Sequence, residues 1–158
     1  HELPLGKTNV WLTDQSSDAL DVARGNLVGV GQKGGGVRLA LGSWWNALDD
    51  SLKGAIDIAV CNPPYIAHDD DEVATDVHAW EPHSALYAGD NGLADIREVI
   101  SGATTWLANN GWLALEIGYQ QGDDVRALLE NAGLVHVEIR RDLAGRDRIA
   151  LAQRQTAS

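Results

Sequence analysis

The sequence predicts an α/β fold in which a largely parallel β-sheet carries helices on both faces and ends in an antiparallel hairpin. Short aliphatic runs typical of strands alternate with segments whose apolar residues recur at helical spacing. The last two strand candidates, 134–139 and 148–152, follow one another without a helix between them, which is the pattern of a hairpin. A length of 158 residues is typical of one domain with a sizeable core.

The first strand candidate is 9–13, and the helix after it can be capped by Ser16 or Ser17. Apolar residues recur at helical spacing over 20–27, and Gly29 supplies a stop. Asp14 therefore lies just past a strand's carboxyl end. In a Rossmann-like unit, an acidic residue there accepts hydrogen bonds from the ribose hydroxyls of a nucleoside cofactor. The alternative is an exposed turn aspartate.

Residues 29–34 read Gly-Val-Gly-Gln-Lys-Gly and match the G-x-G-x-x-G pattern of nucleotide-binding loops. A loop that holds phosphates follows a strand and opens a helix. This one follows a helix and leads into a strand at 37–41, so we interpret it as a surface connection. Trp44 and Trp45 come after that strand. One of them could lie against a purine, or both could serve packing.

The strand candidate 55–61 stops at Asn62-Pro63-Pro64-Tyr65. Two prolines make a stiff turn at the edge where open α/β sheets bind ligands. An Asn amide, outward carbonyls and an aromatic ring in one corner suit a planar group that carries N–H donors. The alternative is an ordinary loop, since Asn and Pro are common turn residues. Cys61, the only cysteine, is expected to be a small core residue.

The residues after Tyr65 lack strong periodicity for about 25 positions, which is typical of a lid or binding loop. Within them, 68–72 is acidic but lacks the spacing of a calcium loop, and no metal site is expected. Helical spacing resumes over 93–107, and Asn109-Asn110-Gly111 predicts the end of that helix. A strand over 112–118 and a helix over 125–132 follow. The turn 142–147 joins the final strands.

The formal charge is −11, from 12 Lys and Arg against 23 Asp and Glu. Such a surface repels phosphate backbones, so no nucleic-acid binding is expected of this chain. The chain contains no Met, no signal-peptide pattern and no segment long enough to span a membrane. We interpret it as a cytoplasmic fragment of a longer protein.

The motifs together resemble the HemK-type protein-glutamine methyltransferases that act on peptide chain release factors. The resemblance covers almost the whole chain and rests on these segments: Asp14 with Asp18-Ala19-Leu20 and 23–26, Ser43-Trp44-Trp45, Asn62-Pro63-Pro64-Tyr65-Ile66, Glu81-Pro82 with Ala85-Leu86, Gly92-Leu93, Glu116-Ile117-Gly118 with Gln121, and 142–148. Many amino methyltransferases share the first groups. The later groups in combination are more specific.

The resemblance implies a seven-stranded S-adenosylmethionine-dependent methyltransferase fold and an enzyme that methylates the side-chain amide of a release factor glutamine. Asp14 would hold the cofactor ribose, Trp44 would border the adenine, and Asn62 would lie between cofactor and substrate. The catalytic corner from Asn62 through Pro63 and Pro64 to Tyr65 would bind the glutamine amide.

The resemblance also implies parts that this chain lacks. The N-terminal helical domain that contacts the release factor, the first strand and the glycine-rich cofactor loop should all precede His1. We therefore expect 1–158 to be a single catalytic domain truncated at its N-terminus. The first strand would lie between 9–13 and 55–61, so its absence exposes two strand edges and predicts weak cofactor binding.

Two other functions stay open on the sequence alone. An adenine-N6 methyltransferase acting on DNA or RNA can use the same Asn-Pro-Pro-Tyr corner, although it should show a basic face. The other possibility is an inactive fragment that only binds a partner through the acidic loop 68–72.

Overall fold

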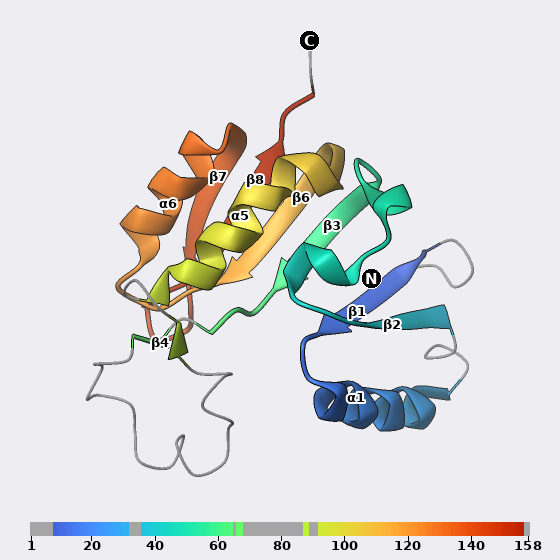
Figure 1. Ribbon diagram of the computed structural model, residues 1–158. Helices are drawn as coiled ribbons and strands as arrows, with labels where there is room; N and C mark the ends of the chain where they lie inside the picture. The colour runs from blue at the N-terminus through green and yellow to red at the C-terminus, as the bar shows by residue number, and fades with distance from the viewer. Residues whose placement is uncertain (1–7, 32–35, 65, 68–86, 89–91, 157–158) are drawn as a thin grey trace. The chain divides into compact units, whose positions relative to one another are not determined.

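The computed structural model describes residues 8–31, 36–64, 66–67, 87–88 and 92–156, which form two compact units, 1–50 and 51–158. Figure 1 shows the elements of each unit. The strands and helices alternate along the chain as expected, and the chain ends in a hairpin.

In the first unit, strand β1 (Val10–Asp14), helix α1 (Ser17–Val30) and strand β2 (Val37–Leu41) form a parallel strand–helix–strand unit. The two strands pair in register from Val10 opposite Val37 to Asp14 opposite Leu41. The Ser16 hydroxyl caps α1 by accepting a 3.3 Å hydrogen bond from the Ala19 amide. The carboxyl ends of β1 and β2 therefore lie at one edge.

The short connection after β2 contains two 3₁₀ helices, η2 (Trp44–Ala47) and η3 (Asp50–Leu52). Residues 29 and 30 belong to α1, which ends at Gly31 with φ of 70°. The predicted stop at Gly29 is therefore two residues early, and the glycine pattern at 29–34 begins in the last turn of α1 and precedes β2. Residues 32–35 lie outside the described part.

In the second unit, β3 (Ile56–Cys61), β6 (Leu107–Glu116), β8 (Asp147–Arg154) and β7 (Leu134–Arg141) form a sheet in the order β3-β6-β8-β7. β3 and β6 are parallel, whereas β8 is antiparallel to both β6 and β7. Two-residue strands β4 (Ile66–Ala67) and β5 (Tyr87–Ala88) pair separately. Mixed pairing confirms the predicted C-terminal hairpin on a parallel sheet.

Helices α5 (Ala94–Trp106) and α6 (Gly122–Asn131) pack on the same face of this sheet (Figure 1). The core between helices and sheet is made of aliphatic side chains, among them Ile96, Leu113, Leu115, Val125, Leu129, Ala150 and Ala152. On the other face, Ile58 and Val60 of β3 are 62% and 80% exposed. Burial on one side alone fixes which residues of each strand face the helices.

The helix was predicted to stop at 109–111 and the strand to begin at 112, which is wrong, because α5 ends at Trp106 and β6 begins directly at Leu107. Pairing with β3 passes from Ile56–Leu107 to Ile58–Trp112, so the extra residues form a bulge. Asn110 takes the positive φ of 62° that this bulge requires. Its carbonyl accepts a 2.9 Å hydrogen bond from Gln153 Nε2 on β8. The strand also ends at Glu116, two residues before the predicted limit.

Among the described residues, β1 pairs only with β2, and β3 pairs only with β6. Each of these strands therefore has one edge without a described strand partner.

Candidate functional site

Asp14 is the last residue of β1, whereas the sequence predicted that it would follow the strand end by one residue. Its Oδ1 accepts a 2.8 Å hydrogen bond from the Ser16 amide, which orients the carboxylate at the strand end. The Asp14 carbonyl accepts a 3.0 Å bond from the Gly42 amide beyond β2. A half-buried carboxylate oriented at this edge has the acceptor chemistry that ribose hydroxyls need.

Trp44 opens η2 at the same edge of the first unit and has an unusual φ of 46°. The backbone turns closely before it: a Cβ on Gly42 would lie 2.8 Å from the Ala47 Cα, so only glycine fits there. The element η2 is in contact with β1. Trp44 and Asp14 therefore lie in one small unit at the carboxyl ends of two paired strands. A carboxylate that accepts hydrogen bonds and a half-buried indole are the two groups that a ribose and its attached purine require.

Asn62, Pro63 and Pro64 leave the carboxyl end of β3 in the second unit. Pro63 is fully buried, whereas the Asn62 side chain is exposed. A buried proline with fixed φ anchors the turn and presents the preceding carboxamide to solvent. Tyr65, the fourth residue of the predicted corner, lies outside the described residues, as do 68–72 and the remainder of 68–86.

The neighbouring strand β6 ends beside this corner. The last register pair of β3 and β6 is Cys61 with Leu115, so Asn62 and Glu116 each follow it by one residue. Neighbouring strands of a sheet lie about 4.8 Å apart. Asn62 and Glu116 therefore occupy equivalent positions at the carboxyl ends of two adjacent strands.

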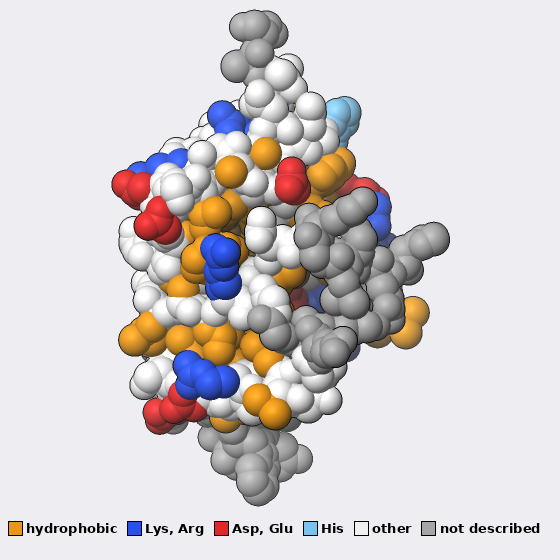
Figure 2. All heavy atoms as spheres, turned by 90° about the vertical axis from the view of Figure 1, so that its right-hand side faces the viewer, with side chains coloured by type: hydrophobic (Ala, Val, Ile, Leu, Met, Phe, Trp, Pro, Cys, Tyr) orange, Lys and Arg blue, Asp and Glu red, His pale blue; other side chains and the backbone are white. Residues whose placement is uncertain are grey.

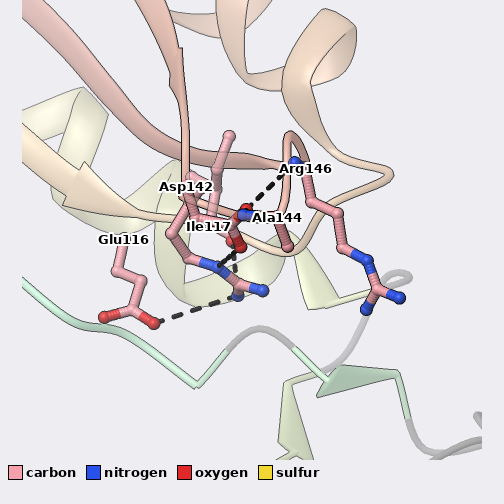
Figure 3. A network of polar contacts seen from close by, with 6 residues as sticks. Glu116, Ile117, Asp142, Ala144 and Arg146 are labelled. Carbon is pink, nitrogen blue, oxygen red and sulfur yellow. Dashed lines mark hydrogen bonds and ion pairs between the residues drawn. The ribbon is translucent and has the colours of Figure 1, made fainter.

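A network of polar contacts connects the end of β6 with the turn between β7 and β8 (Figure 3). Arg148 Nη1 lies 3.2 Å from the Ile117 carbonyl oxygen, to which it donates, and 3.9 Å from Glu116 Oε1. Arg148 Nε is 3.8 Å from Asp142 Oδ2. The Arg148 side chain is 26% exposed. A single guanidinium therefore links both carboxylates to the strand end.

The turn itself is held by Asp142. Its Oδ1 accepts backbone hydrogen bonds of 2.8 Å from Ala144 and 3.0 Å from Arg146. The Arg146 amide, followed by that of Ala144 and the charges of Arg148 and Arg146, holds the pKa of the Asp142 carboxyl below its ordinary value. Gly145 has the positive φ of 78° that the turn needs. The sequence motif 142–148 is thus a constrained turn joined to β6.

The motif Glu116-Ile117-Gly118 with Gln121 also stabilises a local connection. Gln121 is buried, and its Oε1 accepts a 2.9 Å hydrogen bond from the Gly118 amide. A Cβ on Gly118 would lie 3.1 Å from the Gln121 amide group, so a larger residue would crowd this bond. The contact closes the connection from β6 to α6.

Cys61 lies at the end of β3 on the helix-facing side. Burial, followed by the negative charge of Asp95 in the first turn of α5, raises the pKa of the Cys61 thiol to about 12. The thiol is therefore neutral near pH 7 and unsuited to nucleophilic chemistry. Cys61 is half-buried rather than a fully buried core residue as predicted.

The structure places Asp14 and Trp44 in the first unit and Asn62 to Pro64 in the second. Glu116, Asp142 and Arg148 had no role predicted from the sequence, although all three lie in motifs that carry the resemblance. Their signal was the cluster of charged residues after two strand ends. Within the described residues, no group of three or more acidic, His or Cys side chains could hold a metal. No helix there has the length and apolar character of a membrane span.

Several curated proteins resemble this chain closely, although no family model matches it. It is 42% identical over 142 residues to the release factor glutamine methyltransferase of Burkholderia pseudomallei, covering 88% of this chain and 49% of that protein. The corresponding protein of Xylella fastidiosa strain Temecula1 is 40% identical over 147 residues, covering 93% and 52%. The chain thus spans about half the length of these relatives. The resemblance stated from the motifs is confirmed over most of the chain.

Solved structures show the fold. A methyltransferase from Pyrococcus furiosus matches with a TM-score of 0.66 at 14% identity, covering 94% of this chain and 64% of that one. A 16S rRNA N2 G1207 methyltransferase from Thermus thermophilus, in complex with AdoMet and guanosine, matches with a TM-score of 0.57 at 19% identity, covering 96% and 31%. The arrangement of strands and helices is therefore that of S-adenosylmethionine-dependent methyltransferases, as the sequence predicted.

Proposed function

We propose that this chain is catalytic-domain sequence of a release factor glutamine methyltransferase, and that the whole protein methylates a glutamine side-chain amide of a peptide chain release factor. The observation that carries the proposal is the Asn62-Pro63-Pro64 turn at the carboxyl end of β3, in a chain 42% identical to a relative of that name. We propose that both units belong to one catalytic domain of a cytoplasmic enzyme.

S-Adenosylmethionine is the proposed cofactor, and it supplies the methyl group. Asp14 would hold its ribose, because its oriented carboxylate accepts hydrogen bonds. Trp44 would border its adenine, because an indole offers a flat apolar surface to a purine. Asn62 would contribute to the same site. The methyltransferase fold and the chemistry of the Asp14 carboxylate and the Trp44 indole support these assignments.

The chemical difficulty is that a carboxamide nitrogen is a poor nucleophile, since its lone pair is delocalised into the carbonyl. The Asn62 side-chain oxygen and the Pro63 carbonyl oxygen would accept the two N–H bonds of the substrate amide. Both contacts fix the direction of the nitrogen and support positive charge as it develops there. Orientation of this kind can supply up to about 7 to 11 kcal/mol in ideal model reactions.

No strong general base is needed for the last step. An alkylated amide nitrogen that still carries its extra proton is very acidic, and it can release that proton to water or a carbonyl oxygen. Tyr65 would pack against the flat amide and keep its plane fixed.

The full-length protein, incubated with S-adenosylmethionine and purified release factor, is expected to transfer one methyl group to a single glutamine. Mass spectrometry of the peptide that contains the modified residue would locate the methyl group. Replacement of that glutamine by Asn should abolish the transfer. Methylation of DNA, RNA or a ribosomal protein instead would contradict the proposal.

Asn62→Ala in the full-length protein is expected to lower kcat by about a hundredfold or more, because one of the two groups that orient the amide is lost. Asn131→Ala, at an exposed asparagine that ends α6, is the matched control and should leave kcat unchanged. Circular dichroism would verify that both variants are folded. Near-normal turnover of Asn62→Ala would remove Asn62 from the mechanism.

A further inference from the structure

The Asn62 carboxamide has two possible orientations, related by a flip that exchanges its oxygen and nitrogen, and only one of them suits the substrate amide. Its oxygen accepts hydrogen bonds and its nitrogen donates them, so only the orientation with the oxygen toward the substrate is productive. Pro63 and Pro64 have no amide hydrogen that could hold the oxygen in place. An acceptor for the Asn62 nitrogen, on the other side of the carboxamide, would select the productive orientation.

Glu116 is placed to be that acceptor. It follows the register pair Cys61–Leu115 on the neighbouring strand, just as Asn62 does, so the two residues occupy equivalent positions on adjacent strands. In Figure 3 the Glu116 carboxylate extends from the end of β6 toward the pale green segment that leaves β3. The Glu116 side chain is 39% exposed, so its carboxylate lies at the surface of the corner.

The position of Glu116 is supported from its other side. Arg148 Nη1 lies 3.9 Å from Glu116 Oε1 and donates to the Ile117 carbonyl at 3.2 Å. Arg148 is held in turn by Asp142, whose other oxygen closes the β7–β8 turn. A carboxylate that is charge-balanced by a positioned arginine remains a strong acceptor for a neutral N–H donor.

We propose that Glu116 is a positioning residue, whose carboxylate accepts a hydrogen bond from Asn62 Nδ2 in the substrate complex and so turns the Asn62 oxygen toward the substrate nitrogen. This inference rests on the proposed function. Glu116 acts through Asn62 and touches neither substrate nor cofactor. Catalytic hydrogen bonds of this kind commonly tighten only when substrate is bound.

The test is a double-mutant cycle in the full-length protein with release factor as substrate. Glu116→Ala is expected to lower kcat about tenfold to a hundredfold, with the KM for S-adenosylmethionine unchanged, as is typical for residues that orient a functional group. In the Asn62→Ala background the same substitution should lower kcat no further. An equal loss in both backgrounds, or no loss in either, would overturn the inference.

Two further variants separate positioning from folding. Glu116→Gln keeps a side-chain oxygen acceptor and should restore kcat to within a few-fold of wild type. Glu138→Gln is the matched control, because Glu138 lies on β7 in the same sheet and is paired with Arg140 at 2.9 Å. It should leave kcat unchanged. A Glu116→Gln variant as slow as Glu116→Ala, with normal thermal stability, would contradict the proposed hydrogen bond.

The cycle also distinguishes this inference from the proposed function. If the wild-type protein does not methylate release factor glutamine, the proposed function fails. If it does so and Glu116→Ala is as fast as wild type, only the role of Glu116 fails.

Discussion

At the scale of single residues, the carboxyl end of β3 passes from a half-buried thiol to an exposed carboxamide. Burial and the charge of Asp95 keep the Cys61 thiol neutral, whereas Asn62, the next residue, is exposed. The strand ends at Cys61, and Pro63 is fully buried beyond it. The exposed position of Asn62 thus lies between two residues that are more buried.

The thiol of Cys61 is expected to react slowly with iodoacetamide in the folded protein. Its pKa of about 12, compared with 9.0 for an ordinary thiol, leaves about a thousandfold less thiolate near pH 8. Mass spectrometry of the alkylated peptide, with and without denaturant, would measure the ratio. Alkylation at equal rates in both conditions would show that the thiol is not buried.

The same shift has a consequence for stability. Between pH 9 and 12 the unfolded chain loses the thiol proton while the folded chain retains it, so the folded state binds more protons. The free energy of unfolding should consequently fall as the pH rises through this range. Cys61→Ser, which has no thiol, should remove this contribution to the pH dependence.

At the scale of elements, the sequence predicted the helices and the hairpin because their periodicity is local. It failed at 107–111 because the outcome there depends on pairing with β3, which is remote in sequence. Asn110-Gly111 has ordinary turn chemistry. In the fold the same residues form a bulge within β6.

Gly111→Ala should destabilise the protein by at least about 2 kcal/mol, because the new Cβ would lie 2.7 Å from the Ile56 carbonyl oxygen and 2.9 Å from that of Ala108. Both are backbone atoms, which cannot move aside as a flexible side chain can. Thermal unfolding of the full-length protein would measure the change.

Gly25→Ala in α1 is the matched control for this substitution. A Cβ at Gly25 would meet nothing within 4 Å, and alanine favours a helix over glycine by about 0.5 to 1 kcal/mol. It should therefore stabilise the protein slightly. Similar destabilisation by both substitutions would show that the bulge is not the cause.

The candidate site was predictable in part for the same physical reason. Asp14, Trp44 and Asn62 lie at or just after strand ends, which the sequence indicates directly. The contact of Glu116 with Arg148, in contrast, joins residues that are 32 positions apart in the chain. A single sequence does not show which charged residue meets which. The sheet register and the β7–β8 turn decide that pairing.

At the scale of the whole molecule, the charge and the exposed apolar side chains bear on whether the substrate is nucleic acid or protein. The chain has a net charge of −11, and Figure 2 shows both basic and acidic side chains among the described residues. Hydrophobic side chains are also open to solvent on the face that the figure shows. Nucleic acid favours a clustered basic surface. The charge of this chain therefore supports the proposal of a protein substrate over nucleic acid.

Binding of the cofactor is the property most affected by the edges of β1 and β3 that lack a described strand partner. β1 and β3 each pair on one edge only among the described residues, and Val60 on β3 is 80% exposed. The described connection from β1 to α1, Gln15-Ser16, contains no glycine. None of the residues proposed to bind the cofactor, Asp14, Trp44 and Asn62, is assigned to its methionine part.

Chain 1–158 alone is therefore expected to bind S-adenosylmethionine weakly or not at all, whereas the full-length protein should bind it. Calorimetric titration of both proteins would measure the difference, with circular dichroism to establish that the shorter chain is folded. In the full-length protein, Asp14→Ala should weaken binding about tenfold or more, since hydrogen bonds to a charged group contribute about 1.5 to 3 kcal/mol. Micromolar affinity in the isolated chain would contradict the expectation of weak binding, and unchanged affinity in Asp14→Ala would remove the ribose assignment.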